Sequence, residues 1–531
     1  MGFDTDVLII GAGPSGLMLA NEFEKHQVDY QIIDQSLERS HYSKALVVHS
    51  RSMEMLDMLG LADKFTTRGL LIKNIELYYK KERILENDFS LLHDDTDHPY
   101  LCIFPQSDTE AILERNLPPT KVLRGNKLLS LHTTDNGTIA SIEKEDGRIT
   151  TIKGKYMAAC DGAHSRVRKE LNMNFKGKSE DVHVMLGDVK LNNLQEKNKL
   201  RLISSDAGMM FLAPFKNGYT RVIAIDYQKQ DMDGEVDLVG LQESVNKISP
   251  DPLRISDPYW LSNFTASHRQ VDHYFKDGVF FVGDAAHIHN PAGGQGMNVG
   301  IQDASNLAWK LAYVLKYQLS VNLLATYEEE RKKVAEDVIK KTNRMIRGIT
   351  LQSKLGISTR NFVLKRLSRS LIMKKMISKN MSQISVDYRF TDLSKFMPHT
   401  RRGRQAGDRV PNHHNEEFHL YEKLRAGKCL LLMNIEDDDP DIFCEKVLPA
   451  IEDFNERVGG IISPYFIVNA ESWLPDKHRS FLIIDRNKEI SHKLGLKKGE
   501  VIVIRPDAHV LTHLSRFRLK KLAACLQAQF G

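Results

Sequence analysis

The chain has 531 residues, of which 41% are hydrophobic and 27% charged, and its formal net charge is +5 at pH 7. This length exceeds one ordinary hydrophobic core, so we expect two or three domains with the composition of a soluble globular protein. The small net charge argues against a dedicated nucleic-acid-binding protein, and no apolar run is long enough to span a bilayer.

The N-terminus and the cysteines indicate the compartment. The chain opens on the buried-strand pattern "DVLIIGAG" instead of the charged lead and long apolar core of a secretion signal. The five cysteines have no paired spacing, which argues against a disulfide framework, a zinc site or a dithiol redox motif. We therefore expect a cytoplasmic protein without a metal site.

Residues 6–34 read "DVLIIGAGPSGLMLANEFEKHQVDYQIID" and predict a strand, a glycine turn, a helix and a second strand. Gly11, Gly13 and Gly16 form a G-x-G-x-x-G pattern between the first strand and the helix. The first glycine of such a pattern permits a tight turn, and the second lets the backbone approach a pyrophosphate. The third lets the helix pack close to the sheet.

An acid, Asp34, ends the second predicted strand. It follows the glycines by about twenty residues, the place at which dinucleotide-binding folds carry the carboxylate that binds the ribose hydroxyls. A carboxylate at this place disfavours a 2′-phosphate, so the nucleotide bound beside these glycines is expected to be FAD or NAD and not NADP. A glycine turn without a ligand is the alternative, but strand, glycines, helix and acid all fall in register and favour the ligand.

Residues 173–272 alternate apolar and polar side chains, as in "MMFLAPF" and "YTRVIAIDY", and predict antiparallel strands. Met209, Met210, Phe211 and Phe215 are candidates to line a substrate pocket. The alternative for each is an ordinary place in the core of a sheet.

The segment "VGDAAHIHNPAGGQGMN", residues 282–298, follows a strand-like run and precedes a long helical pattern. Asp284 ends the strand at the edge where open α/β sheets bind ligands. Gly293, Gly294 and Gly296 lead into the helix, whose first N–H groups and partial positive charge suit an anion or a ring that becomes one. Reduced flavin becomes such an anion, so two distant motifs fit the two halves of FAD, whereas NAD needs only the first.

Residues 354–379 contain eight lysines and arginines and no acid, with apolar residues recurring between them. A basic amphipathic helix of this kind can lie on an anionic membrane. We favour the alternative, a connecting helix with a solvated basic face, and expect no membrane association.

After "RRGRQAGDRVPN", residues 401–412, a new alternation of strands and helices begins. "CLLLMNI", "FLIIDR" and "EVIVIRPDAHV" predict its strands. The segment has no C-x-x-C, so we expect a role in packing or dimer contact and not in thiol exchange.

Three motifs carry a resemblance over nearly the whole chain. They are "GAGPSG" with Asp34, "CDGAHSRVRKEL" at residues 160–171, and "GDAAHIHNPAGGQGMNVGIQDASNLAWKLA" at residues 283–312, which is followed by "LLATYEEER". Together they resemble the FAD-dependent aromatic hydroxylases, the single-component flavoprotein monooxygenases of the p-hydroxybenzoate and phenol hydroxylase group. The third motif is highly specific.

The resemblance implies a set of FAD-binding residues and identifies no catalytic residue. The set comprises Gly11, Gly13, Pro14, Ser15, Gly16, Asp34, Lys44, Gln106, Asp161, Asp284, Pro291, Gly294, Gly296, Met297 and Asn298. Asp284 is expected to hold the ribityl chain, Pro291 to lie near the reactive ring face, and residues 296–298 to face the pyrimidine end. Lys44 departs from the family, which usually carries arginine there; lysine keeps the charge and loses the two-pronged contact.

The second motif also has features that follow from its residues alone. Ser165 is placed to cap the helix that follows it, and Arg166 to reach a phosphate.

The implied fold is α/β with an α+β insert. A Rossmann-like FAD-binding domain takes residues 1–75, 100–172 and 272–350, and an antiparallel-sheet substrate domain takes residues 76–99 and 173–271. A helical connector, residues 351–400, leads to a thioredoxin-like C-terminal domain of residues 401–531.

The implied function is that of a monooxygenase that uses FAD, NADH or NADPH, and O2 to hydroxylate a small phenolic or polyketide-like aromatic substrate through a flavin C4a-hydroperoxide. The cofactor does the difficult chemistry, so no protein nucleophile or metal is required. His287 belongs to the family's common "DAAH" run and is interpreted as structural. A homodimer is one option, and no nucleic-acid partner is expected.

Two alternatives stay open. A flavin-dependent halogenase shares this fold group but carries a W-x-W-x-I-P signature, whereas Trp260, Trp309 and Trp473 are isolated here. A non-catalytic binding protein on the same fold is disfavoured because both glycine motifs are retained.

Overall fold

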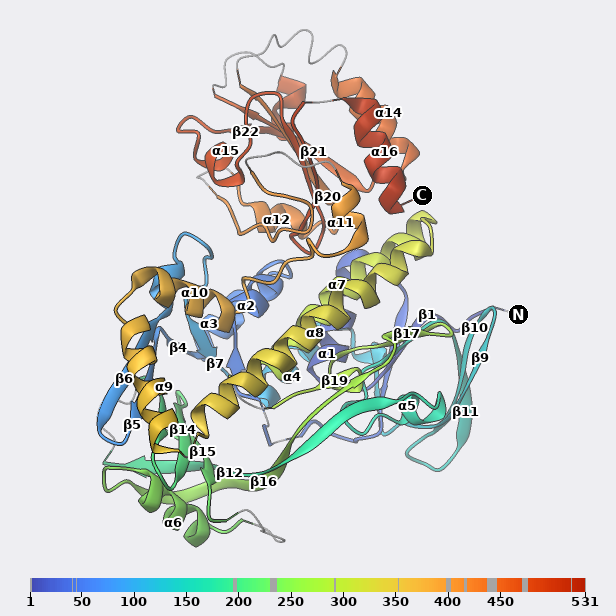
Figure 1. The fold of residues 1–531 in the computed structure, drawn as a ribbon. Coiled ribbons are helices and arrows are strands. Elements are labelled where there is room, and N and C mark those ends of the chain that lie inside the picture. The colour runs from blue at the N-terminus through green and yellow to red at the C-terminus, as the bar shows by residue number, and fades with distance from the viewer. Residues whose placement is uncertain are drawn as a thin grey trace.

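The computed structural model describes residues 2–40, 42–43, 45–193, 198–229, 236–290, 293–351, 353–397, 403–414, 418–436, 447–469, 476–516 and 518–530. Within them the strands form two sheets of eight strands, one of five and one of three (Figure 1). The architecture is mixed α/β, as predicted.

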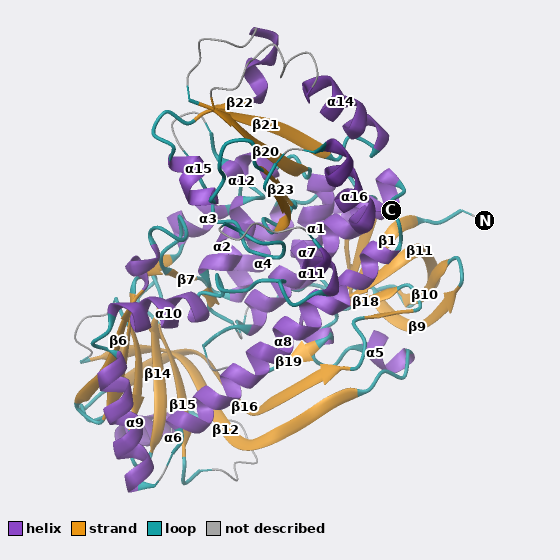
Figure 2. Ribbon diagram, turned by 45° about the horizontal axis from the view of Figure 1, so that its top comes forward, coloured by secondary structure: helices purple, strands orange, loops and turns teal. Residues whose placement is uncertain are grey.

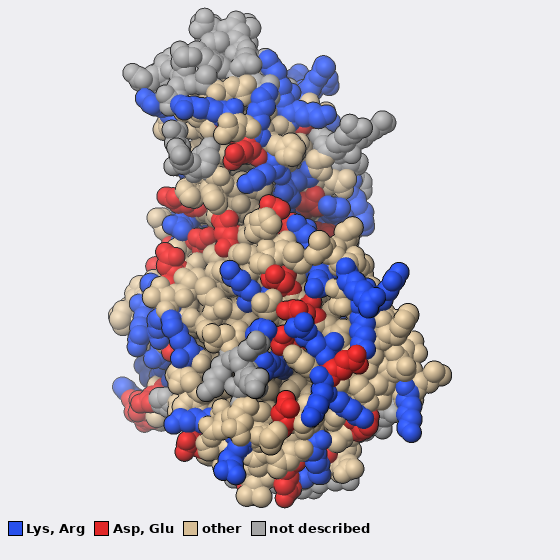
Figure 3. All heavy atoms as spheres, turned by 90° about the vertical axis from the view of Figure 1, so that its left-hand side faces the viewer, with Lys and Arg blue, Asp and Glu red and all other residues tan. Residues whose placement is uncertain are grey.

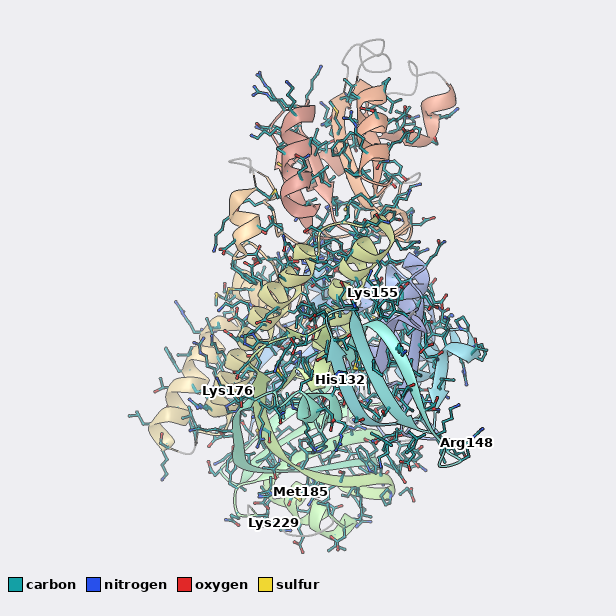
Figure 4. The ribbon with its side chains drawn as sticks, turned by 90° about the vertical axis from the view of Figure 1, so that its right-hand side faces the viewer. His132, Arg148, Lys155, Lys176, Met185 and Lys229 are labelled. Carbon is teal, nitrogen blue, oxygen red and sulfur yellow. The ribbon has the colours of Figure 1, made fainter. Side chains whose placement is uncertain are left out.

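The first sheet is parallel over its centre and has the order β17-β18-β11-β1-β2-β8. Its strands are β1 (Thr5–Ile10), β2 (Tyr30–Asp34), β8 (Val122–Arg124), β11 (Ile149–Ala159), β17 (Phe275–Lys276) and β18 (Val279–Phe281). β9 (Lys127–Thr134) and β10 (Gly137–Glu143) extend β11 as an antiparallel meander, which His132 and Arg148 mark in Figure 4. Val7, Leu8 and Ile9 are fully buried, which explains the unbroken apolar run of β1.

Helices α1 (Pro14–His26) and α7 (Gly296–Tyr317) pack against each other beside this sheet. Leu17, Leu19, Ala20 and Phe23 of α1 are fully buried, as the helical spacing predicts. The long helix α8 (Asn322–Ile349) runs diagonally across the molecule (Figure 1). The other helices here are α2 (Ser50–Asp57), α3 (Ala62–Arg68), α4 (Gln106–Arg115) and α5 (Arg166–Glu170), with the small sheet β3 (Val47–Val48), β7 (Leu101–Ile103) and β4 (Leu70–Ile72).

The second sheet has the order β19-β16-β12-β15-β14-β13-β5-β6 and is antiparallel except between β13 and β5. Its strands are β5 (Asn74–Tyr79), β6 (Glu82–Asp88), β12 (Phe175–Asn192), β13 (Leu200–Ser204), β14 (Gly208–Pro214), β15 (Thr220–Asp226), β16 (Arg254–Val271) and β19 (His287–Ile288). The long strands β12 and β16 run from this sheet toward the first one (Figure 2). Helix α6 (Leu238–Ile248) covers one face, where Met210 is buried, while Met209 and Phe211 point to the other face.

The C-terminal sheet has the order β22-β21-β20-β23-β24 and mixes parallel and antiparallel pairs. Its elements are β20 (Cys429–Glu436), β21 (Ile462–Val468), β22 (Leu482–Ile484), β23 (Val501–Ile504), β24 (Val510–Leu514), α12 (Leu420–Leu424), α14 (Leu448–Arg457), α15 (Glu489–Leu494) and α16 (Leu519–Phe530). The predicted strand "EVIVIRPDAHV" is split, because Pro506 and the left-handed Ala508, with φ of 56°, form a turn between β23 and β24. That this part is thioredoxin-like stays a prediction.

This turn carries charged residues into a buried contact with α7 and α8. Arg505 donates hydrogen bonds to both carboxylate oxygens of Glu330, at 2.6 and 2.9 Å, and pairs with Asp507 at 2.6 Å. Lys310 of α7 lies 2.8 Å from Glu330, and the Asn306 amide donates to Asp507 at 3.3 Å. The C-terminal part is therefore joined to the helix that begins at the glycine loop.

The connector between the second and third sheets contains α9 (Lys354–Leu367), α10 (Leu371–Met381) and α11 (Asp392–Phe396). Among the described residues, no helix combines the length and the apolar character needed to cross a membrane.

Candidate cofactor site

Three sequence motifs begin at the same edge of the first sheet. β1 pairs in parallel with β11, and β11 with β18, so Ile10, Ala159 and Phe281 lie level with one another. The glycine turn, the Asp161 motif and the Asp284 turn directly follow these three positions. Because this edge is where open α/β sheets bind ligands, the arrangement creates one site from three distant segments.

The glycines of the first turn differ in their surroundings. A Cβ on Gly16 would lie 2.1 Å from the Gly11 carbonyl oxygen, and one on Gly11 would lie 2.5 Å from the Cys160 carbonyl oxygen. Gly11 also has a φ of +105°, which favours glycine. A Cβ on Gly13 would meet no heavy atom within 4 Å. Gly13 therefore borders open space in front of α1, whose first N–H groups have no partner inside the helix and suit a pyrophosphate.

Asp34 lies beside this turn, as the spacing predicts. Its Oδ2 accepts a hydrogen bond from the Ala12 N–H at 2.7 Å, and its Oδ1 accepts one from the Ser36 N–H at 2.8 Å. A carboxylate keeps further acceptor capacity in this arrangement, which ribose hydroxyls can use. Gly162, at the end of β11, likewise borders open space.

Ser15 joins the first and third motifs. A Cβ on Gly283 would lie 2.4 Å from Ser15 Oγ, and one on Gly300 would lie 2.3 Å from it. Helix α1, which Pro14 begins, therefore meets both the Asp284 turn and helix α7 at Ser15, and glycine at these two positions permits the approach. The first and third sequence motifs are therefore adjacent in the fold.

The Asp303 carboxylate stabilises the Asp284 turn through buried hydrogen bonds. Asp303 accepts hydrogen bonds from the Gly283 N–H at 3.2 Å, from His287 Nε2 at 2.8 Å and from Arg331 Nε at 2.6 Å. Burial by itself raises the pKa of Asp303, but Arg331 and His287 outweigh it and hold the pKa below its ordinary value. The buried contact with Asp303 gives His287 a structural role, which agrees with the interpretation from the sequence. The Asp284 side chain, in contrast, is exposed.

The second motif caps α5. Asp161 Oδ2 accepts hydrogen bonds from the N–H groups of Arg166 and Val167, at 2.7 and 3.1 Å, and Ser165 Oγ accepts one from the Arg168 N–H, as predicted. Burial raises the pKa of Asp161, and its Oδ1 is buried without a hydrogen-bond partner in the described chain. This oxygen marks a place where a bound group can donate a hydrogen bond.

Arg166, which was predicted to reach a phosphate, makes contacts within the protein. Its guanidinium donates to the Leu129 carbonyl oxygen and pairs with Glu170 at 2.6 Å.

Gln106 fixes the segment before β3. Its N–H contacts Ser43 Oγ at 2.5 Å and donates to the Ala45 carbonyl oxygen at 3.0 Å, and its Oε1 accepts from the Ala45 N–H at 3.2 Å. Two other predicted residues, Lys44 and Pro291, lie outside the described residues.

Asn298 ties the start of α7 to β3. Its amide donates to the carbonyl oxygens of Val47 and Gly294 at 2.8 and 2.9 Å, and its Oδ1 accepts from the His49 N–H at 2.8 Å. The side chain of Asn298 is thus engaged within the protein, and its main chain, with Gly296 and Met297, is what the turn offers to a ligand.

Two histidines, the buried His49 and the half-buried His289, flank the glycine loop. His49 Nε2 lies 2.9 Å from the Gly293 carbonyl oxygen, and His289 Nδ1 lies 2.8 Å from the Asn290 carbonyl oxygen. Burial lowers the pKa of each to about 4, so both are neutral at pH 7. His289 Nε2 has no partner in the described part of the chain, and it is an acceptor if Nδ1 donates. No spacing rule points to His49, which the sequence reading missed.

This chain is similar to known proteins over most of its length. Residues 4–342 match a family model described as "FAD binding domain". The chain is 34% identical over 448 residues to the uncharacterized aromatic compound monooxygenase YhjG of Bacillus subtilis strain 168, covering 82% of this chain and 87% of the relative. It is 30% identical over 526 residues to pentachlorophenol 4-monooxygenase of Sphingobium chlorophenolicum, covering 96% and 93%.

Solved structures share the fold over the full length. The OxyS anhydrotetracycline hydroxylase from Streptomyces rimosus matches with a TM-score of 0.76 over 99% of each chain, at 24% sequence identity.

Proposed function

The chain belongs to the FAD-dependent aromatic monooxygenases, and from this premise we propose how its own residues hold the cofactor and the substrate. It is an oxidoreductase whose cofactor is FAD. Hydroxylation of an aromatic compound is favoured over halogenation or a non-catalytic binding role, because its relatives are named as monooxygenases.

In our proposal the adenosine half of FAD lies over Gly11, Gly13 and Gly16 beside Asp34, and the flavin half lies along the Asp284 turn and the start of α7. The single observation that supports this most is the meeting of the two motifs at Ser15, where Gly283 and Gly300 leave no room for a side chain. The open space at Gly13 and the buried Asp161 Oδ1 fit a bound pyrophosphate and its neighbouring hydroxyls.

The substrate is proposed to lie between the glycine loop and the second sheet. Val47 is 3.4 Å from the position of a Cβ on Gly294, and it belongs to one apolar cluster with Phe211 and Ala213. Bound FAD, once reduced by NADH or NADPH, would activate O2 for hydroxylation of the substrate. The protein's part is to hold an aromatic ring in place and to keep water out of this apolar region.

We further propose a phenolic or polyketide-like substrate, a cytoplasmic enzyme, and the domain division and FAD-binding residues expected from the sequence. The following experiments also test the choice between NADH and NADPH, and sedimentation analysis tests the proposed homodimer. Oxidation of each nicotinamide is measured with a panel of phenols and polycyclic aromatics, and product mass is measured under isotopically heavy O2.

A yellow protein whose NADH or NADPH oxidation rises with one aromatic compound, and whose product carries heavy oxygen, is the expected result. A colourless protein that cannot be reconstituted with FAD would contradict the cofactor site. A chlorinated product formed in chloride buffer would favour the halogenase.

A further inference from the structure

Helices α9 and α10 expose several large apolar side chains and bury some polar ones, although α9 also buries Ile357. Leu355, Phe362 and Ile372 are 80%, 71% and 81% exposed, whereas Asn361 and Ser378 are buried. We call the exposed apolar set the α9–α10 face; it consists of Leu355, Phe362, Val363, Leu371, Ile372 and Met376. The sequence favoured a solvated basic face for these helices. The structure shows that their exposed surface also contains large apolar residues between the cations.

Polar contacts hold this orientation. The Asn87 amide donates to Ser378 Oγ at 2.7 Å, and Ser378 Oγ in turn donates to the Asp88 carbonyl oxygen at 3.2 Å. Lys375 and Lys379 both pair with Asp95, at 2.9 and 2.7 Å. A rotation of α10 that buried its apolar side would break all of these contacts. They therefore keep the apolar side of α10 exposed to solvent.

The same region has a one-sided charge. Residues 338–386 contain twelve lysines and arginines and no acid. Three cations on and beside the face, Arg366, Arg369 and Lys374, form no ion pair with a carboxylate of the described residues, whereas Lys354 interacts with the Asp206 carboxylate. Figure 3 looks at the side of the molecule on which α9 and α10 lie in Figure 1, and it shows Lys and Arg side chains together with Asp and Glu side chains of the whole side and uncharged surface between them.

We propose that the α9–α10 face docks on an anionic lipid bilayer, inserting its apolar side chains between headgroups that its cations attract. Exposed large apolar residues rimmed by basic ones are the pattern by which a helix lies on a membrane without crossing it. An isologous contact with a second copy would place these cations against each other, at an electrostatic cost. A nucleic acid would match the cations and leave the apolar side chains without a partner.

The position of the α9–α10 face in the fold determines which side of the enzyme would lie against a bilayer. Both helices pack on β6, the edge strand of the second sheet, and α10 also contacts residues 89–92. Docking would therefore bring the substrate side of the molecule to the bilayer, where apolar aromatic compounds concentrate. The inference stands apart from the proposed function, since binding is measured without turnover.

The test is co-sedimentation of the FAD-loaded protein with vesicles of phosphatidylcholine alone or mixed with phosphatidylglycerol. The expected result is binding to the anionic vesicles that weakens as salt is raised. Phe362→Ser with Ile372→Ser should lower the partition coefficient by about tenfold or more, because two apolar insertions are lost. Arg366→Glu with Lys374→Glu should lower it by about tenfold or more through charge alone.

Matched controls remove equally exposed groups elsewhere. Ile149→Ser with Val239→Ser removes two apolar side chains, and Lys144→Glu with Lys520→Glu reverses two cations; both pairs should bind as the unaltered protein does. Equal thermal unfolding temperatures show that every variant is folded. Failure of the unaltered protein to bind anionic vesicles overturns the proposal, and so does equal loss in the control pairs. A dimer in sedimentation analysis that Phe362→Ser with Ile372→Ser dissolves, without vesicle binding, assigns the face to a second copy instead.

Discussion

Arg168 donates a hydrogen bond from Nη1 to the Ala285 carbonyl oxygen at 3.1 Å, across 117 positions of sequence. Its Nη2 donates to the Ala163 carbonyl oxygen at 2.6 Å. One buried side chain thus fixes the distance between the Asp161 motif and the Asp284 turn, which the proposed FAD site needs to keep constant.

Replacement of Arg168 by methionine should weaken FAD binding by about tenfold or more, since hydrogen bonds from a charged donor contribute roughly 1.5–3 kcal/mol each. Flavin fluorescence titration measures the affinity, and thermal unfolding of the apoprotein measures the cost to the fold. Arg166→Met, which removes the neighbouring exposed guanidinium, is the matched control and should leave FAD affinity unchanged. Equal affinities in the two variants would show that the Arg168 contact does not shape the site.

Substitutions at two glycines of the first turn should have different effects, one on FAD affinity and the other on the stability of the apoprotein. Gly13→Val places a side chain in the open space before α1, so the apoprotein should unfold at nearly the original temperature while FAD affinity falls by about tenfold or more. Gly16→Ala forces a Cβ against the Gly11 carbonyl oxygen and should destabilise the apoprotein itself by about 1–3 kcal/mol. Calorimetry with and without FAD distinguishes the two. A Gly13→Val protein that retains full FAD affinity would move the pyrophosphate away from this turn.

Much of the structure around the first turn can be predicted from the sequence, because the residues that form it are close together in the chain. The alternation of apolar run, glycines and acid predicted β1 and β2 within one or two residues and a helix between them, and it predicted Asp34 beside the glycines. The support under the third motif did not follow from sequence. Asp303 and Arg331 lie inside helical patterns, and only the packing of α7 against α8 brings them together. His49 was missed for the same reason, since its contact with Gly293 spans 244 positions.

Asp34 should act through its charge as well as its shape. Asp34→Asn keeps an oxygen that can accept from the Ala12 N–H, so the turn should stay folded, while ribose hydroxyls lose their charged partner. The expected loss in FAD affinity is about tenfold, measured by equilibrium titration. Glu38→Gln, an exposed acid shortly after β2, serves as the control. An unchanged affinity in Asp34→Asn would place the ribose elsewhere.

Acid stability should depend on Glu330. Burial raises the pKa of this carboxyl, but Arg505 and Lys310 outweigh it and lower the pKa to about 2. A lowered folded-state pKa means that the stability gained from ionised Glu330 is fully present above about pH 4.5 and is lost as the pH falls toward 2; the gain is about 3 kcal/mol.

Urea unfolding of Glu330→Gln at a series of pH values tests this. The variant should be less stable at pH 7, because Arg505 and Lys310 lose their partner, and its stability should fall less steeply between pH 4.5 and 2. Parallel curves for the two proteins would rule out Glu330 as the titrating group.

The contact between Asn306 and Asp507 joins positions 201 residues apart. During translation α7 leaves the ribosome long before the turn that carries Arg505 and Asp507, and until then Lys310 and Asn306 lack part of the partners that hold the helix. In the proposed site the first turn of α7 faces the flavin, and this helix gains its contacts with Arg505 and Asp507 only when the C-terminal part has been made. We therefore expect FAD to bind the complete polypeptide and not the nascent one.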